Sequence, residues 1–223
     1  RKTCLRICYK ITAHVQGIFG FFSLYTHKSI DADYTEYLGK PSQDDLDDNR
    51  PVSTIVCNHF GWLEIMCLVC SPLHPAFTPK IAVKTTPLLS SLADGLQSMY
   101  VERGSEQGRE QVMAAISERQ RLIEEGSDYA PIVVFAEGTT TNGTTLLRMR
   151  KGAFARMTPI IPCFVTWSGG TIQPSFECIP FWSLIFFWMS SPIPYKVTLH
   201  IMPPFRPNSH MLEKFADKGN EPW

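Results

Sequence analysis

The 223-residue sequence lacks several features that would assign its class at once. Its 21 basic and 21 acidic residues balance, which argues against a nucleic-acid binder built on a basic surface. Glycine and proline show no period, so collagen-like and low-complexity classes are excluded. The chain opens at Arg1 rather than methionine, which predicts a processed or cropped piece whose targeting signal or upstream anchor is missing. With 44% hydrophobic and 19% charged residues, the composition instead predicts a folded domain with a sizeable core.

The cysteines and acidic residues do not form a recognisable metal site. The seven cysteines are an odd number, and the CxxC of Cys67 and Cys70 has no second Cys/His pair at zinc spacing. We therefore expect reduced, mostly buried thiols that pack as small hydrophobic side chains in a reducing compartment. The acidic run at residues 44–48 lacks the glycine and the final glutamate of a calcium-binding EF-hand loop. We predict no metal.

Two segments are candidates for membrane association. Residues 1–27 are largely apolar, with Arg6, Lys10 and His14 at four-residue spacing, which predicts an amphipathic helix. This helix either lies in the membrane interface or docks on the core of the domain. Residues 179–194 are uncharged and rich in aromatic residues, but prolines interrupt them. An interfacial segment and a buried core helix are equally compatible with that pattern.

An acidic, polar linker at residues 28–51 separates the first segment from the body of the chain. Beyond it, β-rich runs alternate with helical stretches, including a helix predicted over residues 107–125. This alternation predicts an α/β domain over residues 52–210, followed by a C-terminal extension at 211–223. The predicted strands are 52–57, 81–84, 99–101, 131–136, 160–167 and 195–202.

Polar residues follow two of the predicted strands. His59 comes just after the first strand, and Glu137 comes at the end of the strand at 131–136. In open α/β sheets ligands bind beyond the carboxyl ends of the strands, so the two clusters are predicted to form one site. His59 can meet Glu64 only if the histidine lies in the turn before a helix and the glutamate lies in its first turn. Such a carboxylate would leave the second imidazole nitrogen as a base, whereas an unpaired turn histidine is the alternative.

Two common motifs are absent. Residues 138–143 are spaced like a P-loop, but Thr144 stands where that motif needs lysine, which disfavours nucleotide binding. No GxSxG elbow occurs, which excludes an ordinary α/β-hydrolase. Arg148, Arg150 and Lys151 follow closely and would serve anionic groups or form a solvated basic patch.

Five motifs in order resemble the glycerolipid acyltransferase superfamily, in its lysophospholipid acyltransferase branch, in particular the plant lysophosphatidylethanolamine and lysophosphatidylcholine acyltransferases. The resemblance covers residues 50–210, and the order and spacing of the motifs make it specific. The motifs are Asn58-His59 with Glu64 in the place of the family's aspartate, Tyr100-Val101-Glu102-Arg103, Glu137-Gly138-Thr139 with its extension Thr140-Thr141-Asn142-Gly143, Arg150-Lys151-Gly152-Ala153-Phe154, and Thr158-Pro159-Ile160-Ile161-Pro162.

The resemblance implies a glycerol-phosphate acyltransferase fold, with a mixed sheet flanked by helices and a membrane-associated N-terminal helix. It implies acyl-CoA-dependent transfer of a fatty acyl group to the free hydroxyl of a lysophospholipid, without a covalent acyl-enzyme. His59 would be the general base, and Glu64 would orient it and stabilise its imidazolium form. The implied substrate-binding residues are Arg103, Glu137, Gly138 and Thr139 for the glycerol-phosphate portion, and Arg150 and Lys84 for phosphate groups.

The same resemblance implies the surroundings of the protein. Acyl-CoA is a co-substrate and no further cofactor is implied; the lysophospholipid and a membrane surface are the partners, possible subunits of a membrane complex are a further class, and no nucleic acid is expected. The endoplasmic reticulum membrane is the compartment that the family favours, with mitochondrial and plastid membranes as alternatives. Because Glu64 is one methylene longer than aspartate, an alternative function is a catalytically weakened relative kept as a lipid-binding or structural subunit of a membrane assembly.

Overall fold

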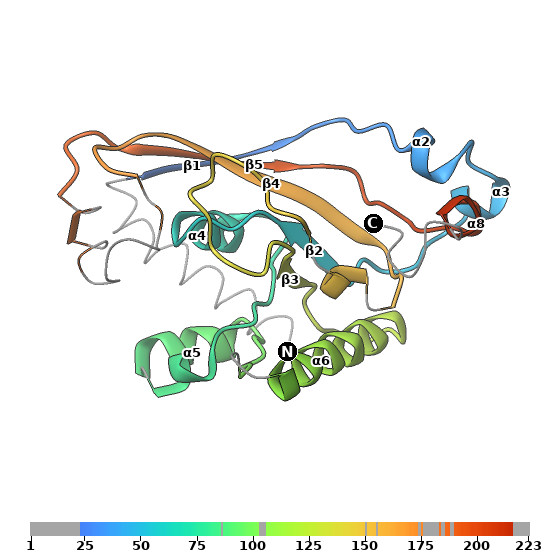
Figure 1. The fold of residues 1–223 in the computed structure, drawn as a ribbon, viewed down its shortest axis with the longest axis horizontal. Helices are drawn as coiled ribbons and strands as arrows, with labels where there is room; N and C mark the ends of the chain where they lie inside the picture. The colour runs from blue at the N-terminus through green and yellow to red at the C-terminus, as the bar shows by residue number, and fades with distance from the viewer. Residues whose placement is uncertain are drawn as a thin grey trace.

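The fold is built on a mixed β-sheet (Figure 1). The computed structural model describes residues 23–85, 87–102, 106–149, 151–154, 156–173, 175, 183, 186–187 and 190–215. Within these residues five strands pair in the order β1-β5-β4-β2-β3. β2 is parallel to β3 and β4, whereas β5 is antiparallel to β4 and parallel to β1. The strands are β1 (Ser23–Ser29), β2 (Thr54–Cys57), β3 (Ile132–Phe135), β4 (Ile160–Gly169) and β5 (Tyr195–Ile201).

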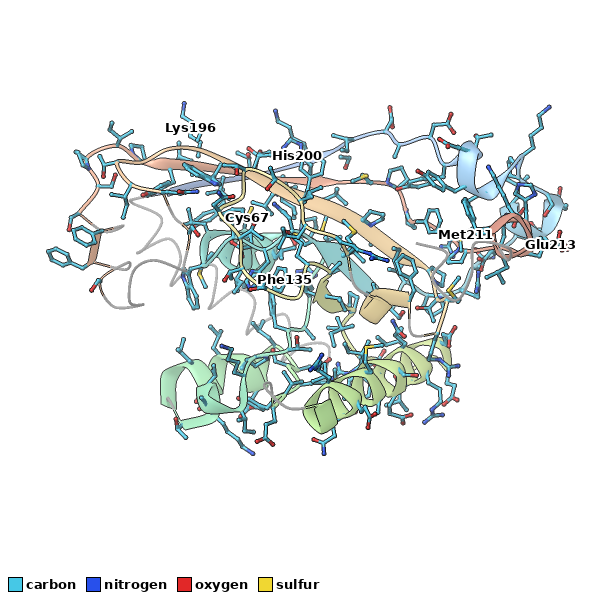
Figure 2. The ribbon with its side chains drawn as sticks, in the orientation of Figure 1. Cys67, Phe135, Lys196, His200, Met211 and Glu213 are labelled. Atoms are coloured by element: carbon cyan, nitrogen blue, oxygen red, sulfur yellow. The ribbon has the colours of Figure 1, made fainter. Side chains whose placement is uncertain are left out.

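The burial pattern of each strand follows from its place in the sheet. β2 lies between two parallel neighbours, and all four of its residues are buried, as expected for a strand covered on both faces. In β5 the buried residues Tyr195, Val197 and Leu199 alternate with more exposed ones, so one face packs on the core and the other faces outwards. Figure 2 shows Lys196 and His200 on the outer side of the sheet and Cys67 on the inner side.

Helices cover the inner side of the sheet (Figure 1). α4 packs against β5 and β1, and its Leu63 and Leu68 join Val197 and Leu199 in the main hydrophobic cluster. α5 and α6 lie towards the β2–β3 end of the sheet, away from β1. The helical segments are α2 (Thr35–Leu38), α3 (Gln43–Leu46), α4 (Leu63–Cys70), η2 (Ile81–Thr85), α5 (Pro87–Gly95), α6 (Glu106–Glu124), η3 (Lys151–Phe154) and α8 (Ser209–Phe215).

The predicted fold class, a mixed sheet flanked by helices, is confirmed. Four predicted strands correspond to β2, β3, β4 and β5, and the predicted helix corresponds to α6. Two predicted strands are wrong. Residues 81–84 form the 3-10 helix η2, and of residues 99–101 only Val101 makes an isolated bridge, to Lys80. A short apolar run has the composition of a strand, but it forms one only where a neighbouring strand edge is free to pair with it.

The expected segment boundaries need correction at both ends. Residues 23–27 were expected in the N-terminal helix, yet Ser23–Ser29 is an edge strand that pairs with β5 and crosses into the expected linker. Its Leu-Tyr-Thr content suits a pleated edge once β5 is available as a partner. The linker also contains α2 and α3, and α8 crosses the expected boundary at residue 210, with Met211 buried. The β1 strand and α8 therefore belong to the α/β body.

Large parts of both candidate membrane segments lie outside the described residues. Of the N-terminal helix predicted over residues 1–27, residues 1–22 lie outside them, and so does half of residues 179–194. No helix in the described part of the chain combines the length and the apolar character needed to cross a bilayer.

The described cysteines pack in the interior as predicted. Cys57, Cys67 and Cys163 are buried and Cys70 is half-buried, all four as free thiols, while Cys4, Cys8 and Cys178 lie outside the described residues. Burial raises the pKa of the Cys67 thiol to about 12, and burial also raises the pKa of Cys70. These thiols are therefore protonated at neutral pH.

Candidate active site

The turn between β2 and α4 brings a histidine and a glutamate together. β2 ends at Cys57, and α4 begins at Leu63 with Glu64 in its first turn. His59 lies in the turn, and its Nδ1 is 2.5 Å from Oε1 of Glu64. This is the arrangement that the five-residue spacing requires, because both residues would point apart on one continuous helix.

The Glu64 carboxylate is fully buried and is surrounded by donors. It accepts the backbone N–H groups of Phe60 (3.1 Å) and Gly61 (2.8 Å) in addition to the imidazole. These N–H groups precede the helix and have no helical partner, so an acidic side chain in the first turn stabilises them. An ionised carboxylate only accepts hydrogen bonds, so Nδ1 of His59 carries the proton and donates it, and Nε2 keeps a free lone pair.

The rest of the imidazole is also held in place. Its ring stacks on Phe135 of β3, with ring centroids 4.0 Å apart and an interplanar angle of 12°; Phe135 is labelled in Figure 2. The His59 side chain is 15% exposed, and Nε2 makes no hydrogen bond to any of the described residues. One ring face and the Nδ1 edge are thus fixed, while the Nε2 edge is available.

The second strand end holds the backbone of the same histidine. Glu137, just after β3, is buried; its Oε1 accepts the His59 N–H (3.1 Å) and its Oε2 accepts the Leu147 N–H (3.2 Å). The chain then turns back at Gly138, whose φ of 71° suits glycine. As a result the Thr141 N–H donates to the His59 carbonyl oxygen at 2.8 Å. The Thr141 hydroxyl oxygen, Oγ1, lies 3.3 Å from the same carbonyl oxygen. The two predicted clusters do converge.

Two residues that the sequence reasoning did not place in the site support this turn. The Asn58 side chain bonds both backbone groups of Val165 on β4, accepting at 2.8 Å and donating at 3.1 Å. Thr141 accepts a hydrogen bond at its carbonyl from the Ser175 hydroxyl, 3.0 Å away. Both Asn58 and Thr141 stand inside the motifs quoted above, and a polar side chain directly after a buried strand was the available signal for Asn58.

The other predicted site residues are less closely associated with His59. Gly138 and Thr139 are exposed in the turn beyond β3. Lys84 is exposed on η2, with its Nζ 5.7 Å from the ring centroid of Tyr100, and it contacts neither His59 nor Glu64. Arg103 and Arg150 lie outside the described residues, so their roles stay predictions. Among the described residues, no group of three or more His, Cys, Asp or Glu side chains is placed to hold a metal ion.

Comparison with known proteins assigns the part of the chain that contains this site to a family. Residues 43–166, more than half of the chain, match the family model named Acyltransferase. The chain belongs to the Acyltransferase family. Its paired His59 and Glu64, and the turn that begins at Glu137, lie within the matched residues.

Individual relatives of this acyltransferase chain are similar over about half of its length. The lysophospholipid acyltransferase LPEAT1 of Arabidopsis thaliana is 34% identical over 119 residues, which are 53% of this chain and 29% of that protein. The lyso-ornithine lipid O-acyltransferase of Rhizobium meliloti is 32% identical over 118 residues, which are 53% of this chain and 38% of that protein. The matched stretch thus spans well under half of the relatives' own length.

A solved structure shares the fold. The crystal structure of the 1-acyl-sn-glycerophosphate acyltransferase PlsC from Thermotoga maritima has a TM-score of 0.55 to this acyltransferase chain, at 16% sequence identity. The superposition covers 96% of this chain and 75% of PlsC. At that identity the likeness concerns the fold, and it agrees with the mixed sheet described above.

Proposed function

We propose that this chain carries the acyl-transfer site of a lysophospholipid acyltransferase. In this proposal a fatty acyl group moves from acyl-CoA to the free hydroxyl of a lysophospholipid at a membrane surface, with the endoplasmic reticulum as the favoured compartment. The observation that carries it is the 2.5 Å contact between His59 Nδ1 and the buried Glu64 carboxylate, with Nε2 available. Membership of the Acyltransferase family and the names of the similar proteins support the substrate class.

The chemical step follows from the tautomer of the histidine. Nε2 of His59 takes the proton of the acceptor hydroxyl while the oxygen attacks the thioester carbonyl. The tetrahedral intermediate then breaks its carbon–sulfur bond, and the imidazolium returns the proton to the departing CoA sulfur. The buried carboxylate of Glu64 stabilises the positive charge that His59 carries between the two transfers, and a well-placed base of this kind contributes about 10²–10⁴-fold in rate.

The surrounding hydrogen bonds supply orientation. Glu137 and Thr141 hold the N–H and the carbonyl of His59, so that the imidazole meets the acceptor in one fixed position. Such positioning accounts for a large part of the rate of a transfer between two bound substrates. The exposed Gly138 and Thr139 are proposed to contact the glycerol-phosphate portion. Arg103 is proposed for the same portion and Arg150 for phosphate groups, because both stand in the family motifs, and Lys84 is proposed as a further phosphate ligand because of its charge.

The proposal is tested with His59→Ala in the purified full-length protein, assayed with a panel of lysophospholipids and acyl-CoAs. We expect turnover to fall below a few per cent of wild type, with an unchanged circular dichroism spectrum. His200→Ala is the matched control. The His200 ring stacks on Phe164 in a similar way (4.4 Å, 10°), but it lies on the outer side of the sheet, so turnover should be unchanged. Substantial turnover in His59→Ala would show that His59 is not the general base.

A wild-type protein that binds lysophospholipid without transferring any acyl group would favour the second candidate, a catalytically weakened lipid-binding or structural subunit. The position of the Glu64 carboxylate favours the active acyltransferase over this second candidate, because the longer side chain still reaches the imidazole of His59.

A further inference from the structure

A strip of exposed apolar side chains lies directly after the turn that holds His59. Leu146, Leu147 and Met149 are 63%, 46% and 53% exposed. They belong to a loop between β3 and η3, drawn in yellow in Figure 1. Single exposed apolar residues are ordinary on protein surfaces, but three within four consecutive positions, close in sequence to a site, favour an interaction surface.

These side chains belong to residues 144–149, which we call the strip. The buried carboxylate of Glu137 links the strip to His59. The Leu147 N–H donates to Oε2 of Glu137, and Oε1 of the same carboxylate accepts the His59 N–H. At its start, the N–H and the hydroxyl of Thr144 both donate to Oδ1 of Asn142, at 3.1 and 2.7 Å. Because these bonds fix the backbone of the strip, whatever covers its leucines is held at a set position relative to His59.

The sequence around the strip has a one-sided charge. Residues 138–176 contain no aspartate and no glutamate, whereas the basic residues of the same stretch include Arg148, Arg150 and Lys151. Apolar side chains flanked by arginine and lysine suit the interface of a bilayer that contains anionic lipids, where each basic residue near the surface adds attraction. A protein partner with an apolar surface would not require this absence of acidic residues.

We propose that the strip docks into the interface of an anionic lipid bilayer and so presents His59 to a lipid in that bilayer. This proposal rests on the proposed function for the identity of that lipid, an acceptor with a free hydroxyl. The docking itself is independent of the chemistry and can be measured without any acyl transfer. Leu146 and Met149 would enter the interface, while the Leu147 backbone keeps its bond to Glu137.

The direct test is hydrogen exchange of the wild-type full-length protein, with and without vesicles of phosphatidylcholine that contain phosphatidylserine. We expect the peptides that cover residues 144–149 to exchange at least several-fold more slowly with vesicles present. Unchanged exchange of these peptides while the protein is bound to the vesicles overturns the proposal.

The second test measures vesicle partitioning of the double variant Leu146→Gln/Met149→Gln. Its matched control is Leu46→Gln/Leu212→Gln, at residues of α3 and α8 whose side chains are 67% and 51% exposed, close to the values in the strip. Since burial of each leucine-sized side chain is strongly favourable, we expect the strip variant to bind at least about tenfold more weakly and the control to bind like wild type. Equal partitioning of the two variants overturns the proposal.

Two further measurements separate the remaining explanations. If light scattering shows a dimer without vesicles that the strip variant dissociates, a second copy covers the strip and the bilayer proposal is wrong. With a short-chain, monomeric acceptor, the strip variant should keep wild-type turnover, whereas with the acceptor in vesicles it should lose most of it. A wild-type protein that is inactive with both acceptors refutes the proposed function, while exchange and partitioning still decide the docking.

Discussion

Glu64 stands where the motif of the acyltransferase family has aspartate. The substitution Glu64→Asp therefore tests how the site uses the longer side chain. The substitution shortens the reach of the carboxylate by one carbon–carbon bond, about 1.5 Å. The contact between Oε1 and His59 Nδ1 is 2.5 Å in the structure. With the backbone unchanged, this distance opens to about 4 Å, which is too long for a hydrogen bond.

Two consequences follow, one for catalysis and one for stability. A misplacement of about 1 Å at a reacting group costs on the order of a hundredfold in rate, so we expect kcat to fall by about that factor. The backbone N–H groups of Phe60 and Gly61 also lose their acceptor, and each unsatisfied buried donor costs about 1–3 kcal/mol. We therefore expect Glu64→Asp to unfold at a melting temperature several degrees lower.

The assay is the release of CoA from acyl-CoA in the presence of a lysophospholipid, with the fold checked by circular dichroism. Glu118→Asp is the matched control, because this exposed glutamate of α6 pairs with Arg121 on the surface and should leave kcat unchanged. A Glu64→Asp variant that equals or exceeds wild type would refute the reasoning, and it would show that the longer side chain weakens the enzyme.

Three further predictions concern the neighbouring structure. Thr141→Val removes the hydroxyl near the His59 carbonyl but keeps the hydrogen bond from the Thr141 N–H. We expect kcat to fall by about 3–10-fold, the value of one neutral hydrogen bond, with KM constant. An unchanged kcat, or a rise in KM as large as the fall in kcat, would contradict the positioning role. Because the pKa of Cys67 is raised to about 12, iodoacetamide at pH 8 should leave it unmodified in the folded protein and label it in urea, whereas labelling of Cys67 at a rate similar to that of the half-buried Cys70 would contradict its buried position. Deleting residues 1–22, which leaves β1 intact, should weaken vesicle binding strongly while changing the melting temperature little. Unchanged binding would assign membrane attachment to the rest of the chain.

Much of the fold was determined by local sequence pattern. The runs that form β2 and β3 are continuous and apolar because both strands lie in the parallel, covered part of the sheet, so composition alone identified them. Helix α6 was predictable from its apolar spacing over many turns. His59 and Glu137 were likewise identified because each follows a predicted strand, and Glu64 because of its five-residue spacing from His59.

Tertiary structure alone decided which groups hold His59 and which strand edges are paired. Glu137 and Thr141 reach His59 from 78 and 82 positions away, through hydrogen bonds to its backbone. Such bonds depend on the register of β2 against β3 and on the turn at Gly138, neither of which leaves a periodic signal in the sequence. The same reason explains β1. Residues 23–29 are a strand because β5 offers them a free edge more than 160 residues later, and a local pattern does not record whether that edge exists.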